Sequence, residues 1–147
     1  MVRCLTLVLG LVFISESNSA PALKEAKSDL KKLQGDWEIV TWEQQGRVLN
    51  MKATWSFDGE KYTLDQQNNL ETGTIKIDQT KKQPTMDLEI IGGNCAGKDQ
   101  PGIYKLDGDT LTLCFAWPGD TERPTEFSTN AANRHVLITL KRIKKDK

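Results

Sequence analysis

The chain of 147 residues has one histidine and three cysteines, and its 20 basic side chains are balanced by 20 acidic ones. A net charge of zero gives no long-range attraction to nucleic acid or to anionic lipid, so we expect neither partner. His135 stands alone, and the chain has no His-x-x-x-His pair and no Gly-x-Ser-x-Gly elbow. The residues of the common zinc and serine-hydrolase sites are therefore missing, and we expect no metal, no cofactor and no catalysis.

Long hydrophobic runs are also scarce. The run at residues 4–14 is too short to span a bilayer, and no later segment is apolar enough to do so. Arg3 precedes this run and small polar residues follow it up to Ala20, which is typical of a secretory signal peptide. We expect a signal peptide at residues 1–20, cut after Ala20 or after Ser19. The product is then an exported protein, periplasmic or extracellular, with one domain at residues 21–147.

The domain begins with a helical pattern. Apolar side chains spaced three to four residues apart predict a short amphipathic helix over residues 22–33. Gly35 suits the left-handed position that ends a helix, and a β-type pattern starts at Trp37.

Alternating apolar and polar residues then continue in short runs to residue 143. They predict eight strands, at residues 35–44, 53–57, 61–64, 72–78, 85–91, 103–106, 110–116 and 134–143. Asp58-Gly59 and Asp107-Gly108 are hairpin signals, and no helical pattern separates the strands, which excludes parallel βαβ units. We expect an all-β fold, namely an eight-stranded antiparallel up-and-down barrel over residues 35–143, with a sandwich as the alternative. Closure would remove the open edges of a flat sheet.

The first strand is ambiguous in its sidedness. Trp37, Ile39 and Thr41 share one face, whereas Val40 and Trp42 share the other. Both faces carry apolar groups, so alternation alone does not decide which one points inward.

Two cysteines, Cys95 and Cys114, remain after signal cleavage. Around the turn at residues 107–109, Cys114 lies opposite residues 101–103, and Cys95 lies in the loop that leads into that strand. Export permits a disulfide. We expect a Cys95–Cys114 disulfide, and two free buried thiols are the alternative.

Gly35-x-Trp37 after a short helix, the meandering strands and Arg142 on the inward side of the last strand resemble the lipocalin-like barrel. This resemblance implies that Trp37 and Arg142 pack against each other as a cation–π pair at the closed end. The segments 33–37, 57–62, 102–111 and 123–127 also resemble an uncharacterised family of secreted domains abundant in planctomycete bacteria. That second resemblance implies the same fold and brings no assigned activity.

An eight-stranded barrel is just wide enough to be filled by its own side chains or to hold one small ligand. We predict an exported lipocalin-like protein that binds a small hydrophobic molecule inside the barrel, oriented by two tyrosines. The predicted ligand-binding residues are Trp55, Phe57, Tyr62, Leu64, Met86, Leu88, Tyr104, Leu113 and Phe115. The alternative is a filled barrel that serves as a protein-interaction or structural module of the cell envelope. The loop at residues 117–127, with Trp117, Arg123 and Phe127, would then contact a protein partner.

Overall fold

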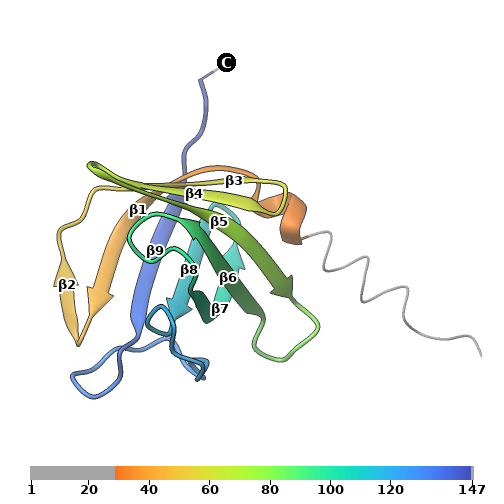
Figure 1. The fold of residues 1–147 in the computed structure, drawn as a ribbon. Coiled ribbons are helices and arrows are strands. Elements are labelled where there is room, and N and C mark those ends of the chain that lie inside the picture. The colour runs from red at the N-terminus through yellow and green to blue at the C-terminus, as the bar shows by residue number, and fades with distance from the viewer. Residues whose placement is uncertain (1–28, 147) are drawn as a thin grey trace, which may run out of the picture.

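The computed structural model describes residues 29–146, which form an all-β fold preceded by a short helix at residues 29–33 (Figure 1). The strands follow in chain order as β1 (Gly35–Gln44), β2 (Arg47–Leu49), β3 (Thr54–Asp58), β4 (Lys61–Gln66), β5 (Asn69–Asp78), β6 (Thr85–Gly92), β7 (Asp99–Asp107), β8 (Thr110–Phe115) and β9 (Val136–Arg142). The expected signal peptide at residues 1–20 and the first part of the expected helix lie outside the described residues. Within the described range, no helix has the length and apolar character needed to cross a membrane.

The sheet closes on itself because β1 pairs with both β3 and β9. From β3 to β9 each strand pairs antiparallel with the next, and the β9–β1 pairing joins the two ends. All strands except β2 thus form a closed antiparallel barrel (Figure 1). This confirms the predicted fold class, and closure satisfies the backbone groups that a flat sheet would leave open.

The sequence analysis did not predict β2. This strand has three residues and pairs only with the end of β1, from Trp42 opposite Leu49 to Gln44 opposite Arg47. The residues of the turn between the two strands, Gln45 and Gly46, have φ angles of 51° and 72°. Positive φ at both positions is the geometry of a tight two-residue hairpin. A strand of three residues is too short to show an alternating pattern, which is why it was missed.

A bulge in β1 decides which of its side chains point inward. The pairing of β1 with β9 shifts register between Ile39 and Thr41, which makes Val40 an extra residue. Trp37, Ile39 and Trp42 therefore all join the buried core, whereas Val40 is 51% exposed. The bulge resolves the sidedness that alternation left open.

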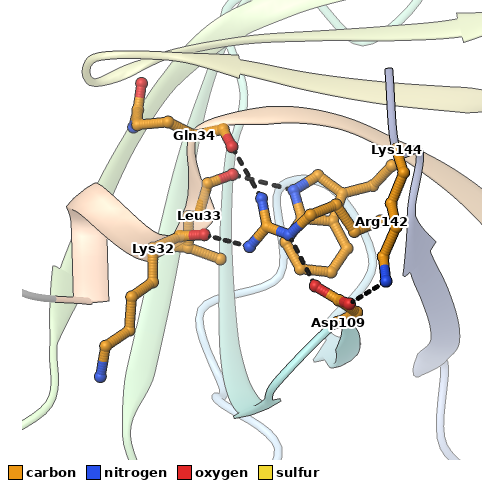
Figure 2. A network of polar contacts seen from close by, with 7 residues as sticks. Lys32, Leu33, Gln34, Asp109, Arg142 and Lys144 are labelled. Atoms are coloured by element: carbon orange, nitrogen blue, oxygen red, sulfur yellow. Dashed lines mark hydrogen bonds and ion pairs between the residues drawn. The ribbon is translucent and has the colours of Figure 1, made fainter. Parts of the chain in front are cut away.

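The pair Trp37–Arg142 lies at the end of the barrel beside the helix. Figure 2 shows Arg142 there next to Lys32 and Gln34. Trp37 and Arg142 face each other in the β1–β9 register, and the guanidinium carbon lies 4.3 Å from the indole centroid. The guanidinium donates to the carbonyls of Lys32 and Gln34, and the indole N–H donates to the Leu33 carbonyl at 2.8 Å. Carbonyls at the end of a helix lack partners within it. The contact that the lipocalin resemblance implies thus also caps the helix.

The structure does not contain the expected Cys95–Cys114 disulfide; both residues are free thiols. The predicted register is correct, since Cys114 lies opposite Ile103. The Cys114 side chain is on the outer side of the wall, however, with its Sγ 4.0 Å from the Ser128 carbonyl oxygen. Cys95 is only half-buried and lies in the loop between β6 and β7. Lying in the same loop–strand unit did not bring the two sulfur atoms together.

Candidate functional site

The residues predicted to line a ligand site form the packed centre of the barrel. Each has at most 3% of its surface exposed, and the set comprises Trp55, Phe57, Tyr62, Leu64, Met86, Leu88, Tyr104, Leu113 and Phe115. The Trp55 ring stacks on the rings of Phe57 and Phe115, each with centroids 6.0 Å apart, and lies 5.6 Å from the Tyr62 ring. Rings at these separations are in mutual contact. Side chains therefore occupy the space in which a ligand was predicted.

The two interior tyrosines already have hydrogen-bond partners. The Tyr62 hydroxyl donates to Glu71 Oε1 at 2.9 Å, and the Tyr104 hydroxyl donates to Asp29 Oδ2 at 2.7 Å. Burial, followed by interaction with these carboxylates, raises the pKa of both phenols well above the usual range. Both phenols are therefore neutral donors that are engaged within the protein, and neither is free to orient a ligand.

Glu71 is an interior-side carboxylate that the sequence analysis missed. It shares the face of β5 that carries the buried Gly73 and Ile75. Burial raises the pKa of the Glu71 carboxyl, and the hydrogen bond from Tyr62 opposes that rise. The predicted strand began at residue 72, so Glu71 was left outside it. The alternation of Glu71 with Gly73 and Ile75 was the available signal.

Two interior indoles have an unused donor. The buried Nε1 atoms of Trp42 and Trp55 have no hydrogen-bond partner in the described part of the chain. A buried donor without a partner costs on the order of 1–3 kcal/mol. These two N–H groups are buried donors that no group in the described part of the chain satisfies.

Several hollows open on the surface of the barrel. One of about 680 Å³ is lined by residues from 116–122 and 130–135. A smaller hollow of about 260 Å³ adjoins it, since Arg134 and His135 line both. Another, of about 610 Å³, runs over the outer wall near β6 and β7. Leu88 of the predicted ligand site lines the hollow near β6 and β7, but no aromatic residue of the interior lines any of the three.

We call the surface around the smaller hollow the loop face; it consists of Gln44, Gln45, Trp117, Arg134 and His135. These residues come from the end of β1, from the chain just after β8 and from the chain just before β9. Three segments that are distant in sequence thus meet at one end of the barrel. Trp117 is 38% exposed there, which is unusual for the largest apolar side chain.

Hydrogen bonds fix these segments relative to one another. The Thr129 hydroxyl donates to Glu43 Oε1 at 2.7 Å and accepts from the Gly46 backbone N–H at 3.0 Å. Asn130 Oδ1 accepts from the backbone N–H of Asn133 at 2.8 Å, and Asn133 Oδ1 accepts from that of Asn130 at 3.1 Å. Such side-chain-to-backbone bonds stabilise turns. The loop face is therefore preorganised although it is built from loops.

Arg134 is positioned mainly by an aromatic ring. Its guanidinium carbon lies 5.5 Å from the Trp117 ring centroid, within the range of a cation–π contact. Its Nη1 is 3.5 Å from Asp120 Oδ1, and these side chains are 60% and 39% exposed. An exposed ion pair at that distance contributes little. The guanidinium is therefore held in place while most of its N–H groups stay free for another partner.

His135 lies next to Arg134 and lines both hollows. The sequence analysis placed it within the last strand, but β9 begins one residue later, at Val136. Its Nδ1 is buried and has no partner among residues 29–146. The run of turn-forming residues before it, which includes Asn130 and Asn133, was the signal that this position ends a loop.

The predicted contact loop at residues 117–127 is held against the barrel by Arg123. This guanidinium donates to both carboxylate oxygens of Asp87, at 2.5 and 3.1 Å, and to the Gly102 carbonyl at 2.7 Å. A bidentate pair of this kind is among the stronger polar contacts in proteins. Arg123 is therefore committed to the fold, Phe127 is half-buried, and of the three residues singled out only Trp117 belongs to the loop face.

Comparison of the chain with protein-family profiles, with curated proteins and with solved structures found no match. In the described part of the chain, no group of three or more His, Cys, Asp or Glu side chains is placed to hold a metal ion.

Proposed function

We propose that this protein is an exported, noncatalytic binding module that contacts a protein partner through the loop face. The observation that carries this proposal is the contrast between a filled interior and a hollowed outer surface. The predicted ligand site is occupied by stacked side chains, whereas Arg134 and His135 line two hollows at one end of the barrel. The export part of the proposal rests on the signal-peptide pattern at residues 1–20.

The residue types of the loop face suit this role. Tryptophan and arginine are the side chains that most often dominate the energy of protein–protein contacts, particularly when a rigid pocket holds them. The Arg134 guanidinium lies over the Trp117 ring, and the chain beside them is fixed by Thr129, Asn130 and Asn133. A rigid surface loses little conformational entropy when it binds.

Affinity capture from the exported fraction of the source organism tests the proposal. Wild-type protein is compared with Trp117→Ala and with the control Ile91→Ala, which removes a side chain that is 61% exposed on β6. We expect one partner to be retained by the wild type and by Ile91→Ala, and to be lost with Trp117→Ala. Equal retention by both variants would exclude the loop face as the contact surface.

A second candidate function is the binding of a small hydrophobic molecule inside the barrel. The unpartnered Nε1 groups of Trp42 and Trp55 favour it, because an acceptor atom of a ligand could satisfy one of them after the core rearranges. Organic extraction of the purified protein and titration with a fluorescent fatty acid distinguish the two functions. A co-purified ligand, or saturable binding that Trp55→Phe weakens, would favour small-molecule binding inside the barrel over protein binding through the loop face.

A further inference from the structure

The smaller hollow of the loop face has a one-sided chemistry. Its lining consists of Gln44, Gln45, Trp117, Arg134 and His135, so it contains a guanidinium and no acidic side chain. The two glutamine amides and the guanidinium supply several N–H donors, and no carboxylate lines this hollow. The larger hollow differs, because Asp120 and Glu122 line it. An anionic group is therefore favoured in the smaller hollow only.

The fork of the Arg134 guanidinium suits a carboxylate. Its N–H groups lie in one plane and match two carboxylate oxygens at once, and a cation–π contact leaves them open to a partner. The cation–π contact with Trp117 holds Arg134 in this way, and its Asp120 contact at 3.5 Å is weak enough to be displaced.

The size of the smaller hollow indicates that its ligand is the end of a side chain rather than a whole small molecule. At about 260 Å³ it is smaller than the roughly 300 to 1,000 Å³ of sites that enclose a small molecule. A carboxylate at the end of a side chain needs less room. The hollow also opens beside the exposed Trp117, so a flanking backbone can pass over the indole.

We propose that this hollow receives an aspartate or glutamate side chain of the partner protein, with its carboxylate bound by Arg134 and the neighbouring glutamine amides. This inference rests on the proposed function, since it names the chemistry that the partner presents to the loop face. Such a contact is a charge-assisted hydrogen bond and weakens as salt is added.

The test uses two short peptides, acetyl-Gly-Glu-Gly-amide and its glutamine counterpart, which differ only in the carboxylate. Binding is followed in ¹H–¹⁵N spectra of the mature chain through the backbone signals of residues 44–46 and 134–135. The indole signal of Trp117 is assigned with Trp117→Phe. We expect saturable shifts with the glutamate peptide, and shifts at least about tenfold weaker with the glutamine peptide. Equal shifts with both peptides, or none, would overturn the proposal.

Variants show whether Arg134 is the anchor. We expect Arg134→Gln to weaken glutamate-peptide binding about tenfold, and Arg134→Lys to fall between Gln and wild type because lysine keeps the charge and loses the fork. The control Lys105→Gln removes an exposed charge on β7 and should bind as the wild type does. An Arg134→Gln variant that has a native-like spectrum and binds normally would exclude the anchor role. If acetate binds as tightly as the glutamate peptide, the hollow serves small carboxylates and the partner-side-chain proposal is wrong.

Failure of this inference is distinguishable from failure of the proposed function. If capture of the partner depends on Trp117 but not on Arg134, the loop face remains the contact surface and the carboxylate is excluded. If capture depends on neither residue, both proposals fail.

Discussion

The hydroxyl of Tyr62 donates a hydrogen bond of 2.9 Å to Glu71, which joins a phenol and a carboxylate on the interior side of β4 and β5. Burial raises the pKa of Glu71 above its ordinary value. The folded protein therefore binds this proton more tightly than the unfolded chain does. The contribution of Glu71 to stability is fully present below the ordinary glutamate pKa and is lost as pH rises through the raised folded value.

Replacing Glu71 with glutamine tests this pH dependence. Glutamine keeps an oxygen that accepts the Tyr62 hydrogen bond and removes the buried charge. We expect Glu71→Gln to be more stable than the wild type near neutral pH, with the difference shrinking as pH falls toward about 4. Urea unfolding across this range measures it, with the exposed Glu38→Gln as the control. Parallel stability curves for the wild type and Glu71→Gln would contradict the assigned environment.

Arg142 contacts both Trp37 and the end of the helix, so its loss should be costly. Arg142→Ala removes the cation–π contact and leaves the Lys32 and Gln34 carbonyls without these donors. We expect a loss of about 2–4 kcal/mol in the free energy of unfolding, and a smaller loss for Arg142→Lys. The exposed neighbour Lys141→Ala should change stability little. Thermal and urea unfolding measure all three, and equal stabilities of Arg142→Ala and Lys141→Ala would refute the capping role.

Gly102 has no room for a side chain. It lies opposite Phe115, and an added Cβ would collide with that ring and approach the Cys114 carbonyl oxygen at 2.8 Å. We expect Gly102→Ala to destabilise the protein by about 1–3 kcal/mol. Part of the collision is with the ring, so the same substitution should cost less when Phe115 is leucine. A double-mutant cycle of unfolding free energies measures this coupling, and strictly additive effects would show that the ring is not what Gly102 avoids.

The two thiols should differ in reactivity. Cys114 is fully buried, and burial raises the pKa of its thiol to about 11, whereas Cys95 is half-buried. Because the thiolate is the reactive form, we expect an alkylating reagent to modify Cys95 in the native mature chain and Cys114 only after denaturation. Mass spectrometry locates the modified residue. The Cys95→Ser variant should no longer be alkylated in the native state. If neither Cys95 nor Cys114 has a free thiol in the denatured protein, the disulfide that the sequence predicted is restored.

Repetitive local features of the sequence were read correctly. Alternation and the Asp-Gly turns placed the barrel strands and put Cys114 opposite residues 101–103, a range that includes its partner Ile103, because hairpin pairing depends mainly on neighbouring residues. The side chains predicted to point into the barrel were also correct for most strands, since one face of each strand must be apolar when the sheet closes. Where one extra residue enters a strand, as at Val40, the pattern alone could not show which way Trp42 points.

The candidate site was much harder to predict. Trp117 was singled out as an exposed aromatic, but its partner Arg134 follows it by 17 positions and was assigned to a strand. Arg123 was nearer in sequence and was chosen instead, although it binds Asp87. The sequence carries no local signal that distinguishes a guanidinium bound to the barrel wall from one lying on an indole.

The sequence by itself predicted an antiparallel up-and-down barrel, the order of its eight strands and most of the side chains that face inward, because these follow from hydrophobic periodicity and turn chemistry between neighbouring segments. Only the tertiary structure decided that the interior is full, that the two cysteines stay apart and that Arg134 meets Trp117. Each of these depends on how side chains from distant segments share one space, and close packing is a property of the assembled structure rather than of any single stretch of chain.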